Sequence, residues 1–134
     1  MLKFIMGNIN SINSINKINF ELMQTEINNR NTFIINTLND DNQECLIKGT
    51  ISSNMEVKLL NESLDTMKDR KIIVYGKNCN DEKIFNKYKQ LIELGFTNVY
   101  IYMGGVFEWL LLQEVYGEEQ FPTTSYELDL LKYK

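Results

Sequence analysis

Short apolar runs rich in β-branched residues alternate with segments of helical period along this chain, and this alternation limits the accessible folds more than any other feature. The runs are "TFIINTL" at 32–38, "KIIVY" at 71–75 and "TNVYIYM" at 97–103. Short continuous apolar runs are typical of strands buried on both faces. Strands and helices in alternation predict an α/β fold with a central, mostly parallel β-sheet flanked by helices on both faces.

Helices are predicted over four segments: 19–29, 53–67, 81–94 and 106–117. Asn19 suits the capping position of the first, because its short side chain can accept a hydrogen bond from a free backbone N–H group. Gly95 and Gly117 are expected to end the third and fourth, since glycine readily takes the conformation that closes a helix. Both helices should therefore stop at a glycine.

The second helix carries a start signal of its own. Ser53 and Glu56 have the spacing of a capping box. Its buried face is expected to consist of Val57, Leu60, Leu64 and Met67. The preceding segment "CLIKGTI", at 45–51, is expected to be another short extended piece.

At 134 residues the chain has the length of one domain, which we place at 18–134. Residues 1–17 include an Ile/Asn-rich, low-complexity run and are expected to form an arm. The protein is expected to be cytoplasmic. It would be membrane-associated only if translation began at Met6, because "MGNINS" would then present Gly7 for myristoylation.

Composition excludes several classes of function. The chain has no histidine, so Ser–His and Cys–His catalytic pairs and histidine-ligated metal sites are impossible. A net charge of −4 argues against nucleic acid as a partner. No apolar stretch approaches the roughly 18 to 20 residues that a transmembrane helix needs. No metal and no cofactor are expected.

The chain has two cysteines, Cys45 and Cys79. They are too few and too far apart for a zinc ribbon, and both are expected to be reduced thiols. Cys45 is expected to be buried as a small apolar residue. A disulfide between them is the alternative if both face the ends of the strands, and it is less favoured because a reducing compartment is expected.

The loop after "KIIVY" is the candidate site. Ligands of open α/β sheets bind beyond the carboxyl ends of the strands, where this loop is predicted to lie. Backbone amides in such a loop, next to a helix start, can bind an anion or activate a thiol. The candidate nucleophile is Cys79, and the candidate anion-binding residues are Gly76, Lys77, Asn78, Asn80 and Asp81.

Residues 71–109 resemble the second half of a rhodanese domain. The features are the strand "KIIVY", a short loop, a helix ending in "LGF", the strand "NVYIY", and "GG" followed by "FEW" at Trp109. More weakly, "FELMQTEI", "FIINTL" and "ECLIKGTI" are similar to the first half, so the resemblance spans roughly 18–110. The tail "EWLLLQEVYGEEQFPTT" looks like that of divergent rhodanese-like proteins of protists and large DNA viruses. The resemblance implies sulfur transfer through a cysteine persulfide.

The chain departs from the family pattern at several positions. Asn36 and Leu38 stand where the family places Asp and Arg, and Thr50 stands where it places His. Gly76 occupies the catalytic position directly after the strand, with Cys79 three residues later. Rhodanese loops usually carry arginine to hold the anionic donor, and this loop has none.

Two hypotheses therefore remain open, and with them the question whether the protein is an enzyme. The first is a rhodanese-like module with a degenerate loop that acts by binding or regulation and not by catalysis. Its partner would be a protein or a small sulfur-containing anion. The second is a sulfurtransferase that carries a persulfide on Cys79. A cysteine phosphatase of the related cell-cycle type is disfavoured, because the residue six positions after Cys79 is Phe85 rather than arginine.

The last predicted helix is strongly apolar around Trp109. We interpret it as a core helix rather than a partner-binding one, because its apolar residues cover too much of the circumference for a surface helix. Any apolar excess beyond the core would suit self-association, so a homodimer is one partner hypothesis. Glu108 and Glu114 are on different faces of this helix and are expected to be exposed, not to form an acid–base pair.

Overall fold

The computed structural model describes residues 15–134, and within them four parallel strands form one sheet. The strands are β1 (Lys17–Ile18), β2 (Phe33–Asn36), β3 (Ile72–Tyr75) and β4 (Val99–Tyr102), in the order β1-β4-β3-β2. Ile35 of β2 pairs with Val74 of β3, which pairs with Ile101 of β4. The predicted α/β fold with a parallel sheet is confirmed.

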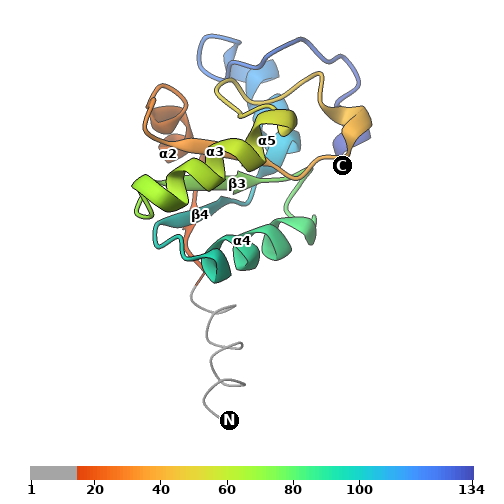
Figure 1. Cartoon of the computed structure of the whole chain (residues 1–134). Helices are drawn as coiled ribbons and strands as arrows, with labels where there is room; N and C mark the ends of the chain where they lie inside the picture. The colour runs from red at the N-terminus through yellow and green to blue at the C-terminus, as the bar shows by residue number, and fades with distance from the viewer. Residues whose placement is uncertain (1–14) are drawn as a thin grey trace.

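Helices cover both faces of this sheet. They are α2 (Phe20–Glu26), α3 (Ser53–Thr66), α4 (Lys83–Leu94) and α5 (Gly105–Tyr116), with short 3₁₀ turns η1 (Asp40–Asn42) and η2 (Leu130–Tyr133). Figure 1 shows α4 on the opposite side of the sheet from α2 and α5. The protein is therefore a three-layer α/β domain.

Alternate residues of the strands face two separate cores. Ile73 and Tyr75 of β3 pack with Met23 of α2 and Trp109 of α5. Their neighbours in β3 point to the other face, where they pack with α3 and α4; the buried residues of that core are Ile35, Leu60, Ile72, Val74, Ile84, Tyr88, Leu91, Phe96, Val99 and Ile101. Each fully buried apolar side chain contributes roughly 1.5–3 kcal/mol to folding, so both faces hold the sheet in place.

Three predicted helix ends are confirmed, and one of them is Gly117, which follows the last residue of α5 with φ of 100°. The Asn19 side chain accepts a hydrogen bond from the backbone N–H of Leu22 at 3.0 Å and so caps α2. Gly95 ends α4 with φ of 115°, a left-handed conformation that L side chains rarely adopt.

The prediction for α3 is wrong in detail. Ser52, not Ser53, precedes the helix, and its hydroxyl binds Asn54 instead of a backbone N–H. Val57 is 68% exposed, whereas Leu60 and Ser63 are buried. Ser63 can be buried because its hydroxyl accepts a hydrogen bond from Arg70 Nε at 3.0 Å, so the buried stripe is rotated away from the purely apolar face.

The segment 45–51 does not form a strand. It makes only isolated bridges, from Ile47 to Thr123 and from Thr50 to Ile34. The reason is Gly49, whose φ of 93° interrupts the extended backbone between the two bridges.

Of the segment expected to be an arm, residues 1–14, including Gly7, lie outside the described part of the chain. Lys17 is in β1 and pairs with Ile101, and the carbonyl of Asn16 accepts a hydrogen bond from the backbone N–H of Ile101 at 2.8 Å. Within residues 15–134, no helix has both the length and the apolar character to cross a bilayer.

Tyr75, the last residue of β3, links the sheet to segment 45–51. Its hydroxyl oxygen accepts from Ile47 N at 3.2 Å and lies 2.7 Å from Thr50 Oγ1. Because the Thr50 hydroxyl donates to the Ile47 carbonyl at 2.6 Å, the Tyr75 hydroxyl is the donor to Thr50. Burial raises the pKa of Tyr75 well above its ordinary value.

This shift predicts alkaline destabilisation. The folded protein keeps the Tyr75 proton above pH ~10, where an unfolded tyrosine loses it, so the contribution of Tyr75 to the free energy of unfolding should be constant below that pH and fall above it. A pH series of urea denaturations would measure the fall. Tyr75→Phe should be less stable at neutral pH, because Ile47 N loses its acceptor, but should show a shallower alkaline decline. An equally steep decline in the variant would contradict the assignment.

Candidate functional site

The loop between β3 and α4 leaves the sheet at its carboxyl edge and packs against the start of α5. The N–H groups of Val106 and Phe107 donate to the carbonyls of Gly76 and Lys77, both at 3.0 Å. Gly105 has φ of 66°, and a Cβ there would lie 2.6 Å from the Gly76 carbonyl oxygen. The free amides in the first turn of α5 therefore bind loop carbonyls, and these hydrogen bonds hold the loop against the start of α5.

The carboxylate of Asp81 lies inside this loop. One of its oxygens, Oδ2, accepts from Lys77 N at 3.1 Å, and the other, Oδ1, accepts from Lys83 N at 3.0 Å. The Thr37 hydroxyl is 3.4 Å from Oδ2. A carboxylate of the chain itself thus accepts from two backbone N–H groups of the predicted anion-binding loop.

Gly76 has no room for a side chain in this arrangement. A Cβ at this position would lie 2.5 Å from Asp81 Oδ2, 2.8 Å from Ile84 Cγ2 and 2.8 Å from Thr37 Oγ1. Contacts under about 3.0 Å at a carbon atom require that something shifts. Gly76 is the residue directly after β3, and the space that its side chain would need is filled by the Asp81 carboxylate.

Asn78 closes the outer part of the loop with both ends of its side chain. Its Oδ1 accepts from Asn80 N at 2.8 Å, and its Nδ2 donates to the carbonyl of Tyr133 at 2.8 Å. The backbone N–H of Asp81 donates to the Asn78 carbonyl at 3.2 Å. The described loop thus directs the N–H groups of Lys77, Asn80, Asp81 and Lys83 to acceptors within itself.

Cys79 lies at the outer tip of the loop and is exposed, with a free thiol. Cys45 is buried, as predicted, and its thiol donates to the carbonyl of Ser125 at 3.3 Å. Burial raises the pKa of the Cys45 thiol, so this residue stays neutral. Both thiols are free, so the alternative of a Cys45–Cys79 disulfide is not realised.

The positions at which the resemblance implies Asp, Arg and His carry neutral groups here. Asn36 and Gln43 exchange two side-chain hydrogen bonds, at 2.8 and 3.1 Å, and Leu38 N donates to Asn36 Oδ1 at 3.0 Å. Thr50 binds Tyr75, as described above. These residues stabilise the loops around the site and bring no charge to it.

The mouth of the loop is bridged by side chains from the neighbouring strand end. Lys83 Nζ binds Asn39 Oδ1, and Thr37 Oγ1 approaches the carboxylate of Asp81. Sequence reasoning missed Asp81 as the acceptor inside the loop. A signal existed, because Asn and Asp side chains often accept backbone N–H groups two residues later, as Asn78 and Asp81 both do.

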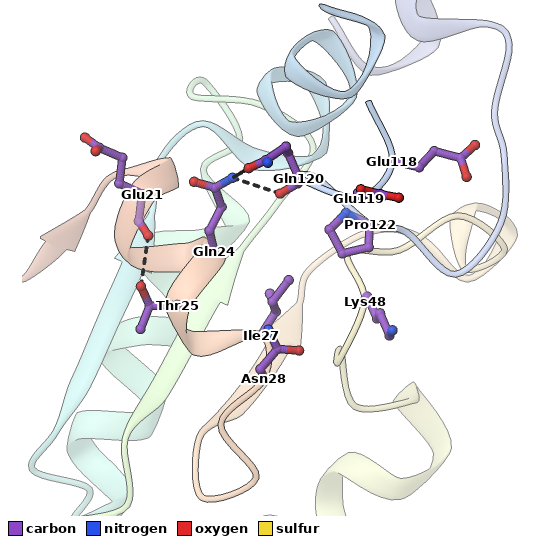
Figure 2. A pocket seen from close by; sticks show the side chains of 10 residues that line it. All are labelled: Glu21, Gln24, Thr25, Ile27, Asn28, Lys48, Glu118, Glu119, Gln120 and Pro122. Atoms are coloured by element: carbon purple, nitrogen blue, oxygen red, sulfur yellow. Dashed lines mark hydrogen bonds between the residues drawn. The ribbon is translucent and has the colours of Figure 1, made fainter. Parts of the chain in front are cut away.

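A separate hollow of about 700 Å³ lies beside α2 and the turn after α5. Its lining shares no residue with the loop; the lining residues are Glu21, Gln24, Thr25, Ile27, Asn28, Lys48, Glu118, Glu119, Gln120 and Pro122. Figure 2 shows Glu21 and Glu118 pointing away from one another on opposite sides of the hollow. Its charged groups do not converge, so we do not consider it the site.

The residues singled out on α5 have separate roles. Trp109 is fully buried in the core, as expected for a core helix. Glu108 is not a free surface residue as expected, because it accepts a hydrogen bond from the Tyr102 hydroxyl at 2.6 Å, whereas Glu114 is exposed. Among the described residues, no group of three or more His, Cys, Asp or Glu side chains could hold a metal ion.

The model of the rhodanese-like domain family matches residues 14–112. The chain therefore belongs to the rhodanese-like domain family. The resemblance and the fold point to the same family. A search of curated proteins gives no match.

Solved structures share the fold at low sequence identity. The rhodanese-like domain of the Alr3790 protein from Anabaena sp. is 19% identical, with a TM-score of 0.55 over 84% of this chain and 89% of that one. The BH2092 protein from Bacillus halodurans is 12% identical, with a TM-score of 0.60 over 100% of both chains. A full-length protein from Lactobacillus plantarum is 14% identical, with a TM-score of 0.56 over 84% of this chain and 95% of that one.

The crowding around Gly76 predicts a specific coupling with Asp81. Gly76→Ala should lower the free energy of unfolding by about 1–3 kcal/mol, because the new methyl group must displace the Asp81 carboxylate. In an Asp81→Ala background the same change should cost less, since its nearest neighbour is gone. Urea denaturation of the four proteins of the cycle measures this coupling.

The control is Asp41→Ala, which removes an exposed carboxylate outside the loop. In that background the cost of Gly76→Ala should be unchanged. If the cost were the same in the Asp81→Ala and Asp41→Ala backgrounds, the carboxylate would not be what fills the space beside Gly76.

Proposed function

We propose that this rhodanese-like domain is a non-catalytic binding or regulatory module. The observation that carries the proposal is the carboxylate of Asp81, which accepts from the loop amides beside Gly76. Rhodanese-type sulfur transfer needs those amides for a thiolate and its persulfide. A resident carboxylate competes with both, because it brings its own negative charge to the same N–H groups.

The arginines support the same conclusion. Both lie outside the loop, and Arg70 binds Ser63 and the carbonyl of Asn31 and stacks over the ring of Phe33 at 4.2 Å. The loop lysines lack the planar fork with which arginine holds an anionic sulfur donor. We infer that the partner is a protein rather than a small sulfur-containing anion, because an anion would first have to displace Asp81.

The alternative function is sulfur transfer through Cys79. The observation in its favour is that Cys79 is exposed and free at the tip of the loop, where a sulfur donor could reach it.

The two free thiols also bear on localisation. They are the expected state in a reducing compartment, so we propose that the protein is cytoplasmic.

A cyanolysis assay with thiosulfate separates the two functions. We expect no thiocyanate formation that depends on Cys79, so wild type and Cys79→Ala should give the same background rate. Cys45→Ala is the matched thiol control, and a catalytic rhodanese domain shows that the assay works. A clear rate for wild type and Cys45→Ala that is lost in Cys79→Ala would overturn the proposal and establish the sulfurtransferase.

Self-association of this module into a homodimer remains a hypothesis. The outer face of α5 exposes Leu111, Val115 and Tyr116, beyond what the core uses. If these residues mediate self-association, sedimentation equilibrium should show a dimer that Val115→Glu weakens and Glu114→Gln does not. A wild-type protein that stays monomeric at high concentration would remove the hypothesis.

A further inference from the structure

Residues 123–133, which follow the part of the chain matched by the family model, run along the edge of the molecule that carries the loop. Thr123 forms an antiparallel bridge with Ile47. Thr124 N donates to the carbonyl of Leu46 at 2.8 Å, and its hydroxyl donates to the carbonyl of Glu44 at 2.9 Å. We call residues 123–133 the strap.

The far end of the strap is anchored in the core. Tyr133, in η2, is 1% exposed and belongs to the same buried cluster as Tyr75 and Trp109. An ion pair of 2.7 Å between Lys132 and Glu127 closes the turn that leads to it. Leu131, in the same turn, points outward and is exposed. The anchor is therefore the fully buried Tyr133 ring together with the half-buried Leu130, and the exposed Leu131 offers a control.

One side chain joins the strap to the loop. The Asn78 amide nitrogen donates to the Tyr133 carbonyl, and its oxygen accepts from Asn80 N, both at 2.8 Å. A primary amide is a donor at one end and an acceptor at the other, so the contact with Tyr133 fixes which end faces Asn80. If the Tyr133 ring leaves the core and its backbone carbonyl moves away with it, the Asn78 side chain loses its outer partner and can rotate away from Asn80.

We propose that the strap is a regulatory device that keeps the loop closed, and that release of Tyr133 frees the N–H group of Asn80 for a ligand. The device acts on the site of the proposed function and rests on it. The ligand gained on release is an acceptor group, such as a carboxylate or a backbone carbonyl of a protein partner, because an N–H donor is what becomes available.

Two other backbone amides of the loop, those of Lys77 and Lys83, serve as an internal control for Asn80. The strap reaches Asn80 through Asn78, whereas Lys77 N and Lys83 N are held by the Asp81 carboxylate, which the strap does not touch by any hydrogen bond within residues 15–134. Loosening the strap should therefore free one amide selectively. General loosening of the loop would free all three.

Amide hydrogen exchange measured by NMR tests the device. In Tyr133→Ala we expect Asn80 N–H to exchange up to about tenfold faster, the effect of one lost hydrogen bond, with Lys77 and Lys83 unchanged. Tyr133→Phe, which keeps the ring, and Leu131→Ala, on the exposed side, should both behave like wild type. Unchanged Asn80 exchange in a folded Tyr133→Ala protein, or equal acceleration at all three amides, would overturn the proposal.

Tyr133→Ala removes a buried ring, so a second variant covers the case in which it does not fold. Lys132→Glu replaces the ion pair with Glu127 by a repulsion outside the core and should lift the same turn. We expect the exchange rate of the Asn80 N–H group to rise about twofold to threefold, and the rates at Lys77 and Lys83 to stay unchanged. No rise in this folded variant would also overturn the proposal.

The outcomes are distinguishable from those of the proposed function. Exchange rates do not depend on any activity, so Cys79-dependent cyanolysis together with selective Asn80 exchange would remove the non-catalytic function and leave the strap. Absence of cyanolysis together with unselective exchange would remove the strap and leave the function.

Discussion

The hydrogen bonds from the loop amides to the Asp81 carboxylate are the interaction on which the rest of the site depends. They hold the backbone of the loop around a carboxylate that the chain itself supplies. Hydrogen bonds to a charged acceptor are worth roughly 1.5–3 kcal/mol, so the closed form is strongly favoured. The glycine at position 76 is what makes this possible, because any side chain would occupy the place of the carboxylate.

The same arrangement accounts for the exposed position of the Cys79 thiol. A residue directly after β3 directs its side chain among Asp81, Ile84 and Thr37, whereas Cys79 lies at the exposed tip of the loop. Below the loop, the first amides of α5 are used by the carbonyls of Gly76 and Lys77. Within the loop, the N–H groups of Lys77, Asn80 and Lys83 are likewise used by the side chains of Asp81 and Asn78, so none of these donors is directed at Cys79.

Much of the fold could be predicted from the sequence, because the buried parallel strands leave a direct record in apolar β-branched runs. The buried side of α3 could not, since the hydrogen bond that allows Ser63 to be buried comes from Arg70, a residue beyond the end of the helix whose side chain folds back onto it. At the site, the position of the loop followed from strand order alone. The direction of the Asp81 carboxylate depends on backbone dihedral angles and on Thr37, 44 residues away in the chain, and no local pattern encodes that contact.

The residues that follow the family match are part of the same folded unit, and this bears on how the loop is controlled. Trp109 Nε1 donates to the carbonyl of Pro122 at 3.1 Å, and Gln113 Nε2 donates to the carbonyl of Phe121 at 2.8 Å. The chain after α5 is thereby fixed along the sheet, so it reaches the loop edge with little conformational freedom left to lose. A contact made by so constrained a segment is a suitable point of control, because its strength follows from the packing of Tyr133 and Leu130 in the core and not from the loop itself.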